Sequence, residues 1–204
     1  MEHYFPTIDH ARLLHLLSRR FKGLAFMQLL ERIIESYQSV PGKGLPIGSL
    51  TSQHFANYYL DSADRFLLNH PAVCAHICYM DDIVWWCKDK SDAQGVLQEL
   101  RDHVRNVCQL KLKPLIQINR SAQGITYCGF RILPGTMRLT ARKQHRYRYL
   151  RQHYETAWEH GIVDDQGLQA AYDAILAATL PAHSKTWRQR DLQLHPCLYD
   201  NANG

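Results

Sequence analysis

The chain has 204 residues, 46% of them apolar, which suffices for one large domain or a domain with an appendage. No apolar run approaches the length of a membrane span, and the N-terminus lacks the charged-then-apolar pattern of a signal peptide. These features argue against a membrane or secreted protein, so we expect a cytoplasmic protein without a membrane partner. The net charge of +5 favours a polyanionic partner.

The cysteines have no metal-binding spacing. None of the six forms a CxxC pair, and several fall in predicted strands, where buried free thiols are common; they are Cys74, Cys78, Cys87, Cys108, Cys128 and Cys197. This pattern predicts a reduced protein without a structural zinc site.

The first third of the chain predicts helices. Asp9 is a suitable N-cap for a helix rich in leucine, and a second apolar-periodic segment runs from Leu24 to Tyr37 until the breaker Pro41-Gly42-Lys43-Gly44. Ser49 or Ser52 then begins a long helix. Its expected inward positions are Phe55, Tyr59, Ala63 and Phe66.

Two adjacent acids separate two short apolar runs. The runs Val73–Tyr79 and Ile83–Trp86 are rich in β-branched and aromatic residues, which predicts a β-hairpin with Asp81 and Asp82 at its tip. Two neighbouring carboxylates repel each other, and a hard divalent cation such as Mg²⁺ would offset that repulsion. An ordinary Asp-rich turn is the alternative interpretation.

The remaining segments predict more strands and then helices. Ser91 is expected to cap a helix, and strands are expected at Leu115–Ile118, at Ile125–Leu133 and, after a Pro134-Gly135 turn, at Met137–Leu139. Helices follow at residues 143–160 and 166–178. Together the elements predict an α+β fold, an antiparallel sheet with helices on one face, followed by a small helical part.

A basic stretch lies between His103 and His153. It holds eleven Lys or Arg and no Asp or Glu: Arg105, Lys111, Lys113, Arg120, Arg131, Arg138, Arg142, Lys143, Arg146, Arg148 and Arg151. Tyr147, Tyr149 and Tyr154 are interleaved and could stack on bases. We therefore predict contact with nucleic-acid phosphates, mainly through Arg142, Lys143, Arg146 and Arg148; a solvated basic face is the alternative.

Five segments occur in a recognisable order. They are Tyr4-Phe5-Pro6-Thr7-Ile8-Asp9-His10, Gly44 to Gln53, Tyr79-Met80-Asp81-Asp82, Leu110-Lys111-Leu112-Lys113-Pro114 and Gly129-Phe130-Arg131-Ile132. Together they resemble the palm of a reverse transcriptase over residues 1–140. The resemblance implies a palm over residues 1–139 and a helical thumb over 140–204. It also implies that Tyr4 and Phe5 lie on a strand beside the acidic hairpin.

The resemblance assigns roles to individual residues. Asp81 and Asp82 would be catalytic and would share two Mg²⁺ ions. Residues contacting the template or the incoming dNTP would be Gly44, Pro46, Gly48, Ser52, Gln53, Lys111 and Lys113. Residues supporting the cDNA primer would be Tyr79, Met80, Gly129 and Phe130. A simple loop around the glycines, solvation of the lysines and a buried strand at Gly129 are the alternatives.

The family's first motif aligns only in part. Aligning its aromatic pair with Tyr4 and Phe5 places the third metal-binding Asp one residue before Met1, and the fingers normally precede that motif. We therefore expect a partial chain that lacks the first catalytic Asp and the fingers.

The subtype is suggested by the second motif. Ile47-Gly48 and Ser52-Gln53 are similar to the pattern of diversity-generating retroelement reverse transcriptases. Those enzymes copy a template RNA with frequent errors opposite adenine and work with a small basic accessory protein. Two functions stay open: an RNA-directed DNA polymerase of this or of a group II intron or retron type, and an inactive remnant that binds nucleic acid or a partner protein.

Overall fold

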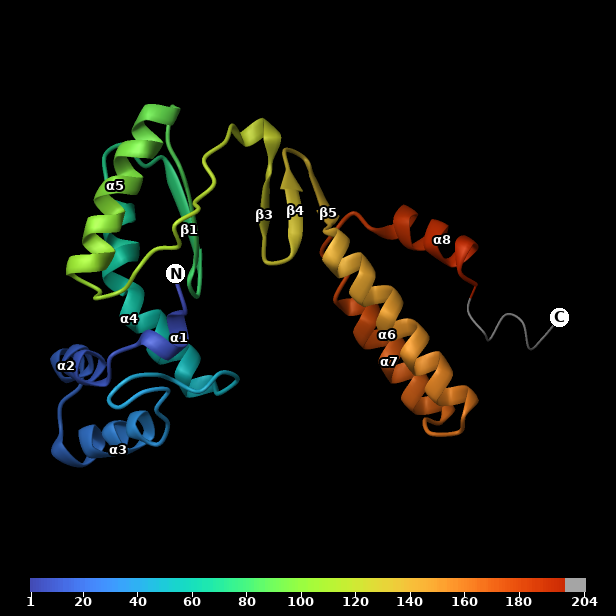
Figure 1. The fold of residues 1–204 in the computed structure, drawn as a ribbon, viewed down its shortest axis with the longest axis horizontal. Coiled ribbons are helices and arrows are strands. Elements are labelled where there is room, and N and C mark those ends of the chain that lie inside the picture. Colours follow the sequence, from blue (N-terminus) through green and yellow to red (C-terminus); the bar gives the residue numbers. More distant parts are fainter. Residues whose placement is uncertain (197–204) are drawn as a thin grey trace. The chain divides into compact units, whose positions relative to one another are not determined.

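The computed structural model describes residues 1–196 and divides the chain into two compact units, Met1–Ile118 and Asn119–Gly204 (Figure 1). The expected boundary after Leu139 lies inside the second unit, so the division into palm and thumb remains a prediction. Cys197 lies outside the described residues. No helix among the described residues is long and apolar enough to cross a membrane.

The first unit contains five helices and one hairpin. The helices are α1 Tyr4–Thr7, α2 His10–Arg20, α3 Leu24–Glu35, α4 Leu50–Asn69 and α5 Lys90–Asn106. Asp9 caps α2 as expected, because its Oδ1 accepts a hydrogen bond from the Arg12 amide at 2.9 Å. The cap of α5 is Asp89, which accepts from the Asp92 amide, and not Ser91 as expected.

The core of the first unit is built from all five helices, and the hairpin packs against it through partly buried Ile83 and Trp85. Tyr59, Ala63 and Leu67 of α4 are buried and belong to one apolar cluster with Val96, Leu100 and Val104 of α5. Burying each large side chain contributes about 1.5–3 kcal/mol. Phe66 was expected to face the core, but it is only partly buried. The neighbouring Leu67 is fully buried instead.

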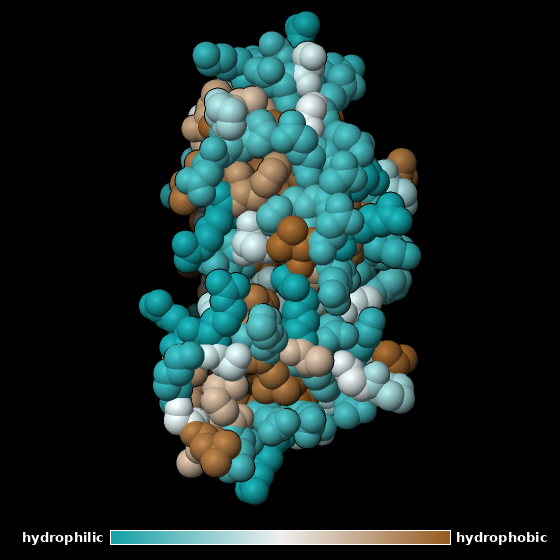
Figure 2. Space-filling model, turned by 90° about the vertical axis from the view of Figure 1, so that its left-hand side faces the viewer, coloured by the Kyte–Doolittle hydropathy of each residue, from teal (hydrophilic) through white to brown (hydrophobic). Residues whose placement is uncertain are grey.

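The surface of this unit is largely hydrophilic on the face shown in Figure 2, with apolar side chains in separate patches. Helix α3 leaves Leu24, Phe26 and Leu29 exposed. Its buried positions are Leu30 and Ile34, so only one edge of this helix faces the core.

The hairpin consists of β1 Ala75–Tyr79 and β2 Asp82–Trp86, paired antiparallel with Tyr79 opposite Asp82. Side chains alternate between the two faces of a strand. His76 and Cys78 are partly buried, and β1 contacts α4, whereas Ile77 and Tyr79 are exposed on the opposite face. One face of the hairpin therefore packs on α4 and the other is open.

Two expected strands are wrong in this unit. Tyr4 and Phe5 lie in α1, where the Thr7 hydroxyl bonds the His3 and Tyr4 carbonyls and the Tyr4 hydroxyl donates to the Ala56 carbonyl. Residues 115–118 form no strand either. Pro114 offers no amide for a ladder, and Leu115 is 92% exposed, so this apolar segment has no buried sheet face to join.

The second unit begins with a three-stranded antiparallel sheet in the order β3-β4-β5. After a short 3-10 turn at Ser121–Gln123, the strands are β3 Ile125–Tyr127, β4 Phe130–Leu133 and β5 Thr136–Leu139. The single strand expected over Ile125–Leu133 is instead a hairpin. Cys128 and Gly129 have φ values of 47° and 79°, and this left-handed pair reverses the chain.

Up to residue 196, where the described part of the chain ends, three helices follow in the second unit: α6 Ala141–Glu159, α7 Asp165–Ala177 and α8 Lys185–Leu194. The first two match the expected helices, whereas α8 was not expected. Leu168, Ala171 and Ile175 bury one face of α7, and α6 and α7 pack together. Both units mix helices with small antiparallel sheets, so the α+β prediction is confirmed.

Candidate active site

The two acids lie at the tip of the β1–β2 hairpin, as the sequence predicts. The turn consists of Met80 and Asp81 and joins the paired residues Tyr79 and Asp82. Met80 has a φ of 54°, a left-handed conformation that is strained for a residue with a side chain. The Asp81 side chain is 29% exposed and Asp82 is exposed, so water and ligands reach both carboxylates.

Three segments far apart in sequence meet at this turn. The Met1 amino group donates to the Asp81 carbonyl at 3.1 Å and lies 3.4 Å from the Asp81 Oδ2. The Glu2 amide donates to the Lys111 carbonyl at 2.9 Å. The first residues of the chain therefore bridge the acidic hairpin and the segment around Lys111, whose side chain is exposed, as is that of Lys113.

A buried tyrosine lies under this region. Tyr4 is 3% exposed, and burial raises the pKa of its phenol, with smaller contributions from Tyr59, Cys108 and the negative charge of Asp81. Burial also raises the pKa of Tyr59 to about 12. Both phenols are therefore neutral at physiological pH and add no negative charge beneath the acid pair.

The two glycines of the Gly44–Gln53 loop have different surroundings. Gly44 is buried, its φ is +108°, and a Cβ there would lie 2.6 Å from the Ser39 Oγ and 2.8 Å from the Ser39 amide. Gly48 is exposed, its φ is +95°, and a Cβ would meet nothing within 4 Å. Packing within the protein explains Gly44, whereas only Gly48 leaves open space for a ligand.

The loop leads into the N-terminus of α4. Pro46 is half-buried, and Ser49 is the residue before the first turn. Ser52 is buried at 2% exposure, whereas Gln53 is exposed and its amide donates to the Ser49 carbonyl at 3.3 Å. The Gln53 side chain is therefore accessible to a ligand, whereas the buried Ser52 side chain is not.

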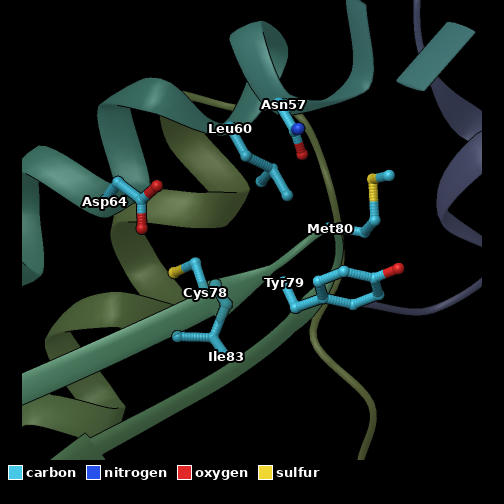
Figure 3. A pocket seen from close by; sticks show the side chains of 7 residues that line it. All are labelled: Asn57, Leu60, Asp64, Cys78, Tyr79, Met80 and Ile83. Atoms are coloured by element: carbon cyan, nitrogen blue, oxygen red, sulfur yellow. The ribbon is translucent and has the colours of Figure 1, made fainter. Parts of the chain in front are cut away.

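A cavity of about 290 Å³ lies behind the turn, between α4 and the hairpin (Figure 3). It is lined by Asn57, Leu60, Asp64, Cys78, Tyr79, Met80 and Ile83. Tyr79 is nevertheless 61% exposed, so much of its ring remains accessible for contact with a primer.

The other expected primer-contact residues, Gly129 and Phe130, lie in the second unit at the β3–β4 turn. The Thr140 hydroxyl donates to the Gly129 carbonyl at 2.9 Å. The Lys143 ammonium lies 3.7 Å from the centre of the Phe130 ring, a cation–π contact. These contacts hold the turn on the first residues of α6.

The four basic residues expected to bind phosphate differ in availability. Arg142 and Arg146 are exposed on α6. Lys143 lies over Phe130, and the Arg148 Nε donates to the buried carboxylate of Asp191 at 2.5 Å. Lys143 and Arg148 thus already have partners, so phosphate contact by them would compete with contacts inside the unit.

The expected stacking role of Tyr147 is wrong, because Tyr147 is 5% exposed and its ring packs edge-on against Trp187. Tyr149 is 59% exposed and stacks with His153 at a centroid distance of 6.1 Å. Arg142, Arg146, Tyr149 and His153 recur at helical spacing and form one face of α6, here called the α6 stripe.

The structure also assembles a group that sequence reasoning missed. Asp64 of α4 lies beside His76 and Cys78 of β1, with ligand atoms all within 4.8 Å of one another. The three residues have no recognisable ligand spacing, so only the packing of β1 on α4 brings them together.

Comparison with known protein families gives a match over the first part of the chain. A family model described as reverse transcriptase (RNA-dependent DNA polymerase) matches residues 1–132, which include the acidic hairpin. No curated protein matches the chain significantly.

Proposed function

The chain belongs to the reverse transcriptase family, and from this premise we propose that it takes part in RNA-directed DNA synthesis through Asp81 and Asp82. The observation that carries the proposal is the pair of accessible carboxylates at a hairpin tip within the matched segment. Two adjacent acids in a turn repel each other, and a bound divalent cation would offset that repulsion.

Reverse transcriptases use divalent metal ions, in general Mg²⁺, and the donors at this turn fit such an ion. The carboxylates of Asp81 and Asp82 are hard oxygen ligands. When bound, two Mg²⁺ ions favour deprotonation of the primer 3′-hydroxyl and stabilise the leaving pyrophosphate.

A third carboxylate is proposed at the position that precedes Met1 in the family's pattern. The Met1 amino group lies 3.1 Å from the Asp81 carbonyl, so a residue joined to it would lie beside the acid pair. A third anionic ligand should help the site to hold two divalent ions.

Substrate contacts are proposed around the hairpin. Gly48 offers unobstructed backbone, and the exposed Gln53 follows it at the start of α4. Lys111 and Lys113 carry exposed ammonium groups on the segment that pairs with Glu2. These groups would bind the template and the triphosphate of a dNTP, while Tyr79 would contact the primer.

The test uses two matched extensions of the chain. Both add the fingers segment of a related reverse transcriptase before Met1, and its last residue is Asp in one protein and Asn in the other, so the two proteins differ by one charge. We expect cDNA synthesis on a primed RNA template with Mg²⁺ from the Asp-extended chain and little from the Asn-extended chain. Asp81→Asn in the Asp-extended chain should abolish synthesis.

Two results would contradict parts of this proposal. Equal synthesis by the two extended chains would remove the role of a third carboxylate. Synthesis that persists after Asp81→Asn would remove the role of the hairpin acids.

The proposed subtype is a diversity-generating retroelement enzyme, which rests on Ile47-Gly48 and Ser52-Gln53. The exposed Gln53 side chain can be tested without disturbing α4, because Gln53→Ala keeps the amide that bonds Ser49. In an active extended chain, Gln53→Ala should lower misincorporation opposite template adenine, and Gln38→Ala serves as a control. Unchanged fidelity would count against the subtype and against the proposed basic accessory protein.

The second candidate function is nucleic-acid binding without catalysis, and the α6 stripe favours it because it needs no metal. Its exposed arginines and Tyr149 suit phosphates and bases. Template–primer binding that is strong, insensitive to Asp81→Asn and never accompanied by synthesis would identify this alternative.

A further inference from the structure

The partly buried face of the β1–β2 hairpin carries a group of polar side chains that nucleotidyl transfer does not use. His76 and Cys78 alternate along β1 and lie on the same face of the strand. Asp64 projects from α4 toward them, and its Oδ1 lies 3.6 Å from the His76 Nε2. Figure 3 shows the Asp64 carboxylate and the Cys78 sulfur directed toward each other beside the cavity.

This arrangement is costly without a cation. The Asp64 side chain is 43% exposed, but its Oδ1 is buried and forms no hydrogen bond in the part of the chain that the structure describes. A buried oxygen without a hydrogen-bond partner lowers the free energy of unfolding. Burial raises the pKa of the Cys78 thiol, and the neighbouring Asp64 carboxylate with its negative charge raises it further. A bound cation would compensate the carboxylate and would favour the thiolate.

The donor set suits a transition metal better than Mg²⁺. Thiolate, imidazole and carboxylate are the ligands of Zn²⁺, whereas Mg²⁺ prefers oxygen alone. In a tetrahedral zinc site the ligand atoms lie about 3.3–3.8 Å apart, as bond lengths near 2.0–2.3 Å require. Donor atoms already within 4.8 Å of one another need only small side-chain movements to reach that geometry.

We propose that Asp64, His76 and Cys78 bind a Zn²⁺ ion, with water as the fourth ligand, at a site distinct from the Asp81–Asp82 pair. Three protein ligands from α4 and β1 would tie the strand that leads into the catalytic turn to the longest helix of the unit. The sequence predicted no zinc site because the cysteines have no CxxC spacing. A site formed by Asp64, His76 and Cys78 has no such spacing, so the sequence pattern could not reveal it.

Cobalt binding tests the proposal directly, because a Co²⁺–thiolate bond absorbs in the near ultraviolet and reports a cysteine ligand. We expect this band on titrating the 204-residue chain with Co²⁺, and its loss on adding Zn²⁺ but not Mg²⁺. Cys78→Ser should remove the band. His76→Asn and Asp64→Asn should weaken binding at least about tenfold, since even outer-shell changes have effects of that size.

Matched controls separate this site from others. Cys74→Ser removes a nearby exposed thiol, and Asp81→Asn alters the catalytic pair; both should leave the band and the affinity unchanged. A band that disappears in Cys74→Ser, or persists in Cys78→Ser, would overturn the assignment. Asp81→Asn is expected to abolish DNA synthesis but to leave cobalt binding unchanged. Failure of the polymerase proposal can therefore be distinguished from failure of the zinc-site proposal.

A second measurement uses the wild-type chain and therefore does not depend on whether a substituted protein folds. Alkylation of the wild-type chain, followed by peptide mass spectrometry, reports each cysteine separately. Zn²⁺ should slow alkylation of Cys78 at least about tenfold, because the metal-bound thiolate is sequestered, and should leave Cys74 and Cys128 unaffected. Equal alkylation of Cys78 with and without Zn²⁺ would show that no metal binds there.

Discussion

At the scale of single residues, the site region combines positions that serve the fold with positions that are free for ligands. Gly44 and Gly48 illustrate the difference, because both adopt positive φ but only Gly44 is packed against another part of the chain. Cys108 and Tyr4 lie in the same core and are neutral groups whose ionisation the fold opposes.

The two glycines should respond differently to alanine. Gly48→Ala should reduce the free energy of unfolding by about 1–2 kcal/mol through backbone strain alone. Gly44→Ala should cost at least about 1 kcal/mol more, because its Cβ also collides with Ser39. Urea unfolding measures both. Equal losses would mean that Ser39 moves without cost.

Cys108 should make the protein sensitive to alkaline pH. It is fully buried, and burial raises the pKa of its thiol, against weaker opposite effects of Ser62 and Arg12. A raised folded-state pKa contributes stability that is complete below the unfolded pKa of about 8.5 and is lost as pH rises through the folded value.

The corresponding measurement is urea unfolding at neutral pH and above pH about 9. The free energy of unfolding should fall over this range, and Cys108→Ala should make the fall shallower. Cys128→Ala, at an exposed thiol, is the control and should leave the wild-type fall unchanged. A fall that is equally steep in Cys108→Ala would exclude this thiol as a cause.

At the scale of elements, α8 is joined to α6 through buried charge. Asp191 of α8 is 2% exposed and lies 2.5 Å from the Arg148 Nε and 3.8 Å from the Arg151 Nη1. Arg151 is also 2% exposed, lies 3.3 Å from Glu155, and donates to the His195 carbonyl. The network thus balances two cations with two anions, which buried charges require.

Removing one anion from this network should be costly. Asp191→Asn should lower the free energy of unfolding by about 3–5 kcal/mol, because Arg151 stays buried with less compensating charge. Asp61→Asn breaks an exposed pair with Arg65 and serves as the control, with a much smaller expected effect. Equal effects of the two substitutions in urea unfolding would show that burial adds nothing to the Asp191 contacts.

At the scale of the whole molecule, basic residues are concentrated in one part of the sequence. The fold pairs some of them with acids and leaves others exposed. Residues 103–153 hold eleven Lys or Arg and no Asp or Glu, whereas the whole chain has a net charge of +5. Two of these arginines, Arg148 and Arg151, form ion pairs inside the second unit. The arginines of α6 that are classed as exposed are those of the α6 stripe, Arg142 and Arg146.

Salt dependence of nucleic-acid binding should identify the accessible charges. The double substitution Arg142→Gln and Arg146→Gln should reduce the slope of log affinity against log salt by up to about 0.9 for each duplex phosphate that is no longer neutralised. The exposed pair Arg19 and Arg20 at the end of α2, changed likewise, is the control. An unchanged slope in the α6 variant would show that the stripe is only solvated.

The sequence by itself determined the features that local chemistry controls. Apolar runs of strand length on either side of Asp81 and Asp82 predicted the hairpin tip, and Asp9 predicted the start of α2. These features depend on a few neighbouring residues, whose alternation and capping preferences can be read directly. The order of motifs likewise predicted the family that the match over residues 1–132 established.

Only the tertiary structure decided which partners these residues meet. Tyr4 lies in a helix held by its bond to Ala56, Tyr147 is buried against Trp187, and Arg148 is paired with Asp191. Each partner is 40 or more positions away in the chain, and no local pattern encodes such a distance. The approach of Asp64 to His76 and Cys78 has the same origin, because it follows from the packing of β1 on α4 and not from spacing.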